Sequence, residues 1–232
     1  MKIKIELPEE LTLEQYKSYL MLVDGLTEDG IKERSNAFVK AKLISIVVGL
    51  SIEEVNQIEA KDIDKLFKSC IDIVADAINE GSKLDATPTF TYKDVRFGRI
   101  PSLEQMTAGE YIDLSEYFGK TEYLERFAAV MLRPVDKVLK NTSIGRGQYS
   151  LKKYNGTEEM ADVMRGIPAK HIIAASFFLE RLLVQLATII ISSSESLEAM
   201  TEEKVEVLKT LLLASGDGIK RYMLSLESLS LI

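Results

Sequence analysis

The sequence predicts a mainly α protein: a multi-helix globular bundle with a small antiparallel β element, formed by an N-terminal strand and a hairpin near residues 89–100. Three observations predict this class. Apolar residues recur at spacings of three and four along most of the chain, the period of a helix with one buried face. Capping signals precede these segments, and glycine or proline follows them. Strict alternation of polar and apolar residues is confined to two short stretches.

Length and composition support one sizeable core. The chain has 232 residues, of which 46% are hydrophobic, so it can bury enough apolar surface to fold as a globular protein. We interpret residues 1–232 as a single mostly helical domain, with a flexible arm at 141–156. That arm, NTSIGRGQYSLKKYNG, holds three glycines and a basic pair, a composition typical of loops.

The first part of the chain predicts one strand and four helices. Ile3, Ile5 and Leu7 alternate with polar residues, so Lys2–Leu7 is expected to be an edge strand that ends at Pro8. The four expected helices are Thr12–Val23, closed by Asp24 and Gly25, then 31–50, a short one opened by the Ser51–Glu54 capping box, and Asp62–Gly81. The second of these is expected to be buried nearly all round in its C-terminal half.

The segment Thr89–Ile100 predicts a hairpin. Phe90 and Tyr92 stand at even positions, whereas Val95 and Phe97 stand at odd positions. The alternation of side chains therefore shifts by one residue, which implies a turn near Lys93 and Asp94. An isolated hairpin is marginal in water, so we expect the N-terminal strand to join it in a sheet.

The stretch Thr107–Pro134 concentrates unusual residues. Thr107 and Glu110 form a predicted capping box, and Gly119 breaks the helix that they open. On this helix Tyr111, Leu114 and Phe118 are expected on an apolar face, with Glu110, Asp113 and Glu116 on an acidic one. A second helix, Tyr123–Leu132, stops because Pro134 disfavours the helical region for Arg133.

The last third predicts further helices. Thr157 opens a short one that ends at Gly166, and Pro168 begins Lys170–Ile191, the most apolar helix in the chain. Its apolar residues surround most of the helix axis and must be buried against protein. Either a helix expected at 201–213 covers them, or the chain self-associates into a homo-oligomer.

Charge and composition argue against several partners. The formal net charge is −7 with a pI near 5.0, and the few basic residues form no patch, so nucleic-acid binding is not expected. The N-terminus lacks a secretory signal, and the longest uncharged apolar run, 182–194, is too short to span a bilayer, so we expect a cytoplasmic site of synthesis and no membrane contact. The lone Cys70 lies among apolar residues and is interpreted as a buried structural thiol.

No motif predicts catalysis, a cofactor or a metal. Glu110 and Asp113 share a helix but lack a histidine at metal-ligand spacing, which favours a capping or solvated role. His171 is the single histidine and lies on an apolar helix without a recognisable nucleophile elsewhere. Arg133 is interpreted as pairing with Glu110 or Asp113 at a helix end, with a ligand site as the alternative.

Several short segments resemble small proteins encoded in the structural gene blocks of tailed bacteriophages, most closely those of crAss-like phages. The segments are, in order, ELPEELTLEQY, TAGEYIDLSEYF, AAVMLRP, KKYNG, and an IPA that opens into a helix with SFFLERLL. The most specific parts are Gly109–Leu114, Arg133–Pro134 and Tyr154–Asn155.

The resemblance implies a non-enzymatic virion protein, either structural or packaged as cargo in the particle or tail, with other phage structural proteins as partners. It carries no catalytic residues over to this chain. The candidate structural or partner contacts are Glu110, Tyr111, Asp113, Arg133, Pro134 and Tyr154. Two alternatives remain: an assembly chaperone or adaptor that leaves before the virion matures, and a small hydrolase that uses His171.

Overall fold

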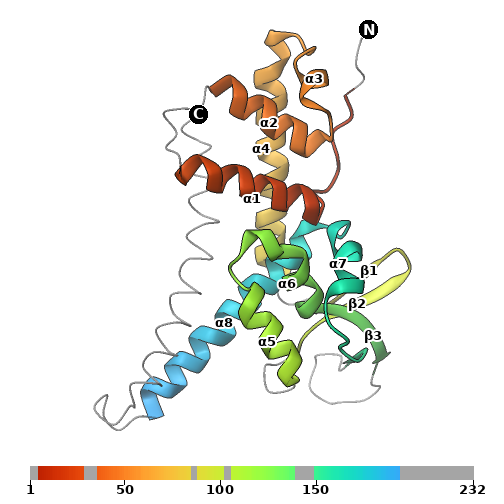
Figure 1. Cartoon of the computed structure of the whole chain (residues 1–232), viewed down its shortest axis with the longest axis vertical. Coiled ribbons are helices and arrows are strands. Elements are labelled where there is room, and N and C mark those ends of the chain that lie inside the picture. Colours follow the sequence, from red (N-terminus) through yellow and green to blue (C-terminus); the bar gives the residue numbers. More distant parts are fainter. Residues whose placement is uncertain (1–4, 29–35, 85–87, 102–105, 139–148, 194–232) are drawn as a thin grey trace.

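The computed structural model describes residues 5–28, 36–84, 88–101, 106–138 and 149–193, and for residues 27, 28 and 184–193 only the helical backbone. The protein is mainly helical with a four-stranded antiparallel sheet, as predicted. Figure 1 shows α2 and α3 beside the upper half of the long helix α4, α1 at about the middle of its length, and α5 to α7 with the sheet toward its lower end, beside α8.

The first three helices are α1 (Leu13–Glu28), α2 (Asn36–Val48) and α3 (Ile52–Val55). The predicted capping box Ser51–Glu54 is present at α3. Thr12 begins α1 in the same way, because its backbone N–H and that of Gln15 each bind the other's side chain. From Val39 to Val48 no residue of α2 is exposed, but only Val39, Leu43, Ile44 and Val47 are buried, so the predicted burial nearly all round is confirmed only in part.

The predicted end of α1 at Gly25 is wrong. The helix continues to Glu28, and Leu26 is almost fully buried. Burying a leucine side chain contributes about 2 kcal/mol, which exceeds the roughly 1 kcal/mol that a glycine costs inside a helix.

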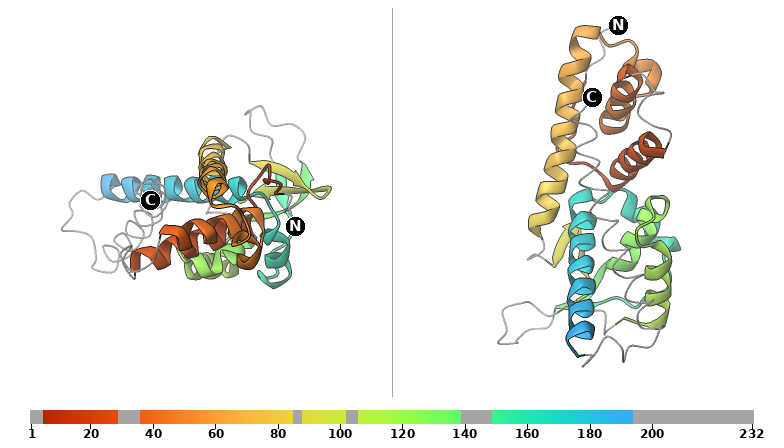
Figure 2. Two further views of the ribbon diagram at one scale, coloured as in Figure 1. Left: turned by 90° about the horizontal axis from the view of Figure 1, so that it is seen from above. Right: turned by 90° about the vertical axis from the view of Figure 1, so that its left-hand side faces the viewer.

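Helices α4 (Ala60–Lys83) and α8 (Ala169–Ser193) pack closely on each other, and Figure 2 shows α8 continuing beyond the end of α4. The contact depends on Gly81, which was wrongly expected to end α4. A Cβ added at Gly81 would lie 2.6 Å from Cγ2 of Ile173 and 3.0 Å from the carbonyl oxygen of Lys170. The glycine therefore lets the two helices approach.

The sheet has the strand order β1-β2-β3-β4, with β1 (Thr89–Tyr92), β2 (Val95–Arg99), β3 (Leu132–Val138) and β4 (Tyr149–Leu151). The predicted hairpin is confirmed: Tyr92 pairs with Val95, and Lys93 and Asp94 both have positive φ. A two-residue turn of this kind matches the twist of its strands.

The strands that complete the sheet differ from the prediction. Residues 1–4 lie outside the described residues, and Ile5–Leu7 form no strand. Instead β3 begins at Leu132, two residues before Pro134, and pairs with β2, where Phe97 lies opposite Pro134. Tyr149–Leu151, expected within a flexible arm, is strand β4; the rest of that arm up to residue 148 is outside the described part. Residues 132–138 and 149–151 are strands because they pair with segments far away in the sequence, and local sequence patterns do not predict such pairing.

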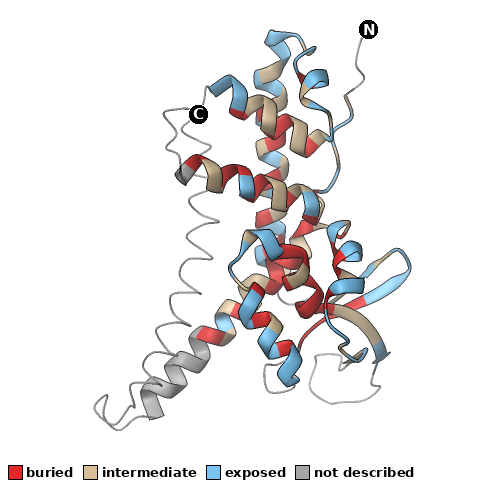
Figure 3. Cartoon of the chain, viewed as in Figure 1, coloured by how far each residue is buried: buried red, intermediate tan, exposed pale blue. Residues whose placement is uncertain are grey.

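Three shorter helices lie beside the sheet: α5 (Ala108–Tyr117), α6 (Leu124–Met131) and α7 (Glu158–Arg165). Gly119 follows α5 with a φ of 76°, which confirms the predicted break. Helix α6 lies in the centre of the core, and all but one of its eight residues are buried (Figure 3).

Cys70 is fully buried on the inner face of α4, in line with its interpretation as a structural thiol. Burial raises the pKa of its thiol to about 12. The helix predicted as Lys170–Ile191 is α8, but the side chains of Ile189–Ile191 and the helix expected at 201–213 lie outside the described part, so their coverage stays a prediction.

Candidate functional site

The candidate site is built on α5, whose first turn is fixed by a capping box. Thr107 Oγ1 accepts a hydrogen bond from the backbone N–H of Glu110, and Glu110 Oε2 accepts one from the backbone N–H of Thr107. The Glu110 carboxylate also forms an ion pair with the guanidinium of Arg133, as predicted. One carboxylate thus begins the helix and binds it to β3.

This ion pair is shielded from water. The side chain of Glu110 is 1% exposed and that of Arg133 is 14% exposed. Desolvation lowers the pKa of Arg133, while the negative charges nearby oppose this shift, and an arginine remains a cation at any ordinary pH. Because burial removes two charges from water, the pair is costly to break from one side only.

Arg133 has two further contacts. Its Nη1 donates a hydrogen bond of 3.0 Å to the carbonyl oxygen of Lys152, and its guanidinium lies 5.6 Å from the centre of the Tyr154 ring. The atom Nε is buried and has no hydrogen-bond acceptor among the described residues. Arg133 therefore connects α5, β3 and the segment that follows β4.

Tyr154 contacts the next turn of α5. Its hydroxyl donates a hydrogen bond to the carboxylate of Asp113. Burial, followed by this hydrogen bond and the charge of Asp113, raises the pKa of the Tyr154 hydroxyl well above its usual value. Glu110 and Asp113 thus bind different partners, and the structure brings together four of the six candidate residues: Glu110, Asp113, Arg133 and Tyr154.

The other two candidates directly follow Arg133 and Glu110 in the chain, but their environments differ from that of this cluster. Pro134 is a strand residue whose carbonyl oxygen accepts a hydrogen bond of 2.9 Å from the backbone N–H of Lys152. Tyr111 is 63% exposed and its neighbour Ile112 is 60% exposed.

The predicted faces of α5 are wrong for two residues: Glu110 lies on the buried side and Tyr111 on the exposed side, whereas Glu116 is exposed and Phe118 packs against the core, as predicted. Leu114 is buried as expected. The error has a physical reason, because a carboxylate that meets an arginine can be buried in place of an apolar side chain.

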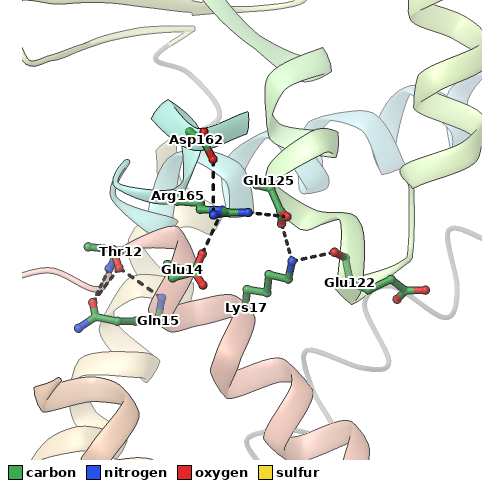
Figure 4. Close-up of polar contacts among 8 residues, drawn as sticks. All are labelled: Thr12, Glu14, Gln15, Lys17, Glu122, Glu125, Asp162 and Arg165. Atoms are coloured by element: carbon green, nitrogen blue, oxygen red, sulfur yellow. Dashed lines mark hydrogen bonds and ion pairs between the residues drawn. The ribbon is translucent and has the colours of Figure 1, made fainter. Parts of the chain in front are cut away.

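A second polar cluster joins α1, α6 and α7 (Figure 4). Lys17 Nζ lies 2.7 Å from Glu125 Oε2 and donates a hydrogen bond to the carbonyl oxygen of Glu122. Arg165 lies within 3.7 Å of Glu125 and pairs also with Glu14 and Asp162. Burial alone would raise the pKa of Glu125, but the hydrogen bond from Lys17 and the charges of Lys17 and Arg165 outweigh burial and lower it.

His171 packs face to face on Phe90, with ring centres 3.7 Å apart. Burial, and then the charge of Lys170, lowers the pKa of His171 to about 4, so the imidazole is neutral at pH 7. The ring therefore has a packing role between α8 and β1.

The neighbouring Lys170 borders a pocket of about 250 Å³, which is lined also by the acidic residues Glu9, Glu10, Asp76 and Glu80 and by the apolar Leu11, Ile73, Ala77 and Pro168. Its ammonium binds both Glu10 and Glu80.

Within the described ranges, no set of three or more His, Cys, Asp or Glu side chains is arranged to hold a metal ion, and no helix has the length and apolar character needed to cross a membrane. Comparison of the chain with protein-family models, with curated proteins and with solved structures finds no match.

Sequence reasoning missed Ile112, Glu125 and the pocket beside Lys170. Ile112 lies on a helix whose orientation depends on the burial of Glu110. Glu125 and Lys17 are 108 residues apart, so no local pattern joins them.

Proposed function

We propose that this protein is a non-enzymatic, virion-associated protein of a tailed bacteriophage, structural or packaged as cargo, which binds another structural protein of the particle through α5. The resemblance of Gly109–Leu114 and Arg133–Pro134 to phage structural-region proteins suggested the class of protein. The observation that carries the binding role is the exposed pair Tyr111 and Ile112 on a helix whose inner side is firmly anchored.

The anchoring explains why these two side chains suit a binding role. Helix α5 is held by its capping box, by the Glu110–Arg133 ion pair and by the Asp113–Tyr154 hydrogen bond. An apolar side chain presented on an ordered element loses little further backbone entropy when it is buried by a partner. Large apolar and aromatic side chains of this kind provide most of the binding energy in protein interfaces.

The test is quantitative mass spectrometry of particles of the phage that encodes this chain, purified by density gradient. A structural or cargo protein remains in the mature particle at a reproducible copy number relative to the major capsid protein. Absence of the chain from mature particles would refute the virion role.

The same measurement on unfinished particles tests the alternative. An assembly chaperone or adaptor is present on these intermediates and lost on maturation, whereas a protein unrelated to the virion is absent from both. Removal of loosely bound protein with a salt wash is the control for contamination.

A further inference from the structure

We infer that the pair Tyr111 and Ile112 inserts into an apolar pocket with a basic rim on a different protein, and not into a second copy of this chain. This inference rests on the proposed function, since it specifies the partner surface that α5 binds.

The shape of the α5 surface implies a concave partner. One helical turn from Tyr111 and Ile112 lie Ala108 and Ser115, both exposed and both small. The two large side chains therefore project beyond these neighbours on α5 as a knob, which we call the α5 knob. A knob buries most of its apolar area only when it enters a pocket, and each side chain of this size contributes about 2 kcal/mol when it is fully buried.

The charge of α5 implies a basic rim. Glu116 is exposed one turn after Ile112, and α5 contains no lysine or arginine. Two nearby cations are already engaged: the ammonium of Lys120 lies 5.7 Å from the centre of the Tyr123 ring, and Arg126 donates to the Tyr117 hydroxyl and pairs with Glu158. A partner that places lysine or arginine opposite Glu116 gains attraction, whereas an acidic rim is repelled.

The same charges disfavour a second copy. The pocket beside Lys170 is lined by four acidic residues, Glu9, Glu10, Asp76 and Glu80, by the apolar Leu11, Ile73, Ala77 and Pro168, and by one ammonium that already binds Glu10 and Glu80. Inserting the α5 knob of one copy into this pocket of another would bring Glu116 to an acidic rim. Packing two α5 knobs against each other would oppose Glu116 with its own copy.

The test is photo-cross-linking with the full chain during infection. The photoreactive amino acid p-benzoylphenylalanine replaces Ile112 in one variant and Met21 in the control. Met21 is a matched control because it is 53% exposed and lies on another helix, α1. The yield and the cross-linked peptides are measured both in infected cells and in purified particles.

The inference predicts a cross-link from position 112, and not from position 21, to a peptide of a different protein in which lysine or arginine borders apolar residues. Glu116→Lys in the same background should reduce the yield about tenfold, as expected for 1.4 kcal/mol of lost binding energy. Glu116→Gln should have a smaller effect. Circular dichroism of each purified variant confirms that it is folded, which is expected because the substituted side chains are exposed.

Three results would overturn the inference: a cross-link to a second copy of this chain, equal yields from positions 112 and 21, or a yield that Glu116→Lys leaves unchanged. These results are separate from failure of the proposed function. If the chain is missing from particles but cross-links from position 112 to a basic-rimmed partner in infected cells, the virion role fails and the partner inference stands.

Discussion

Replacing Arg133 with methionine is expected to lower the free energy of unfolding by about 3 kcal/mol. Methionine preserves most of the apolar stem but removes the charge, so the carboxylate of Glu110 remains buried without its counter-ion. The side chain of Glu110 is 1% exposed, which puts the loss within the range for a buried pair broken from one side. The value is at the low end because Arg133 is 14% exposed and Thr107 still donates to Glu110.

The partner substitution separates the ion pair from the helix cap. Glu110→Gln removes the negative charge, but glutamine also serves at this position of a capping box, so the start of α5 should be retained. We expect a loss of about 2 kcal/mol from the uncompensated guanidinium. In the double variant neither charge is left alone, so its loss should be smaller than the sum of the single losses by about 2 kcal/mol.

Urea denaturation, followed by circular dichroism, measures all four proteins of this cycle. Arg96→Met is the matched control, because Arg96 is exposed and, among the described residues, its side chain donates one hydrogen bond, to Thr89 on the neighbouring strand. Its effect should stay within about 0.5 kcal/mol. Additive single losses, or an Arg133 variant no less stable than the Arg96 control, would refute the claim that this pair holds α5 to β3.

Two further pairs of measurements test the packing. Gly81→Ala should lower the free energy of unfolding by about 1 to 3 kcal/mol, because the added Cβ would lie 2.6 Å from Ile173. Gly25→Ala should raise the free energy of unfolding by up to about 1 kcal/mol, because no atom lies within 4 Å of its added Cβ and alanine favours the helix. A change of the same sign in both variants would contradict the close contact of α4 and α8. The pKa of His171 is about 4 in the folded protein and 6.5 in the unfolded chain, so the unfolded chain binds the proton first and stability falls as pH drops from 6.5 to 4. Over this window the native protein should lose up to about 3 kcal/mol more than His171→Gln, and parallel pH profiles would show that His171 is not desolvated.

Local signals in the sequence predicted several features correctly. The capping boxes at Ser51 and Thr107, the hairpin turn at Lys93 and Asp94, and the end of α6 before Pro134 all depend on residues within about four positions of each other. The physical reason is that a side chain binds a nearby backbone group, or restricts a backbone angle, in the same way wherever the segment lies in the fold.

Only the tertiary structure decided which faces are buried and what they contact. The sequence pattern placed Glu110 on an acidic outer face and Tyr111 on an apolar inner one, and the structure reverses them because Arg133 is available to pair with Glu110. Glycine was interpreted as a helix end at both Gly25 and Gly81, yet both lie inside helices that burial extends.

The sheet and the helix junction show the same limit. The hairpin was predicted, but the strand that pairs with it is β3, which in turn pairs with β4, whereas residues 5–7 form no strand. The ion pair between Lys17 and Glu125 spans 108 positions. Such contacts depend on which distant segments meet in the folded chain. The free energy of burying a group depends on which distant residues surround it in the folded chain, so it cannot be predicted from a short stretch of sequence.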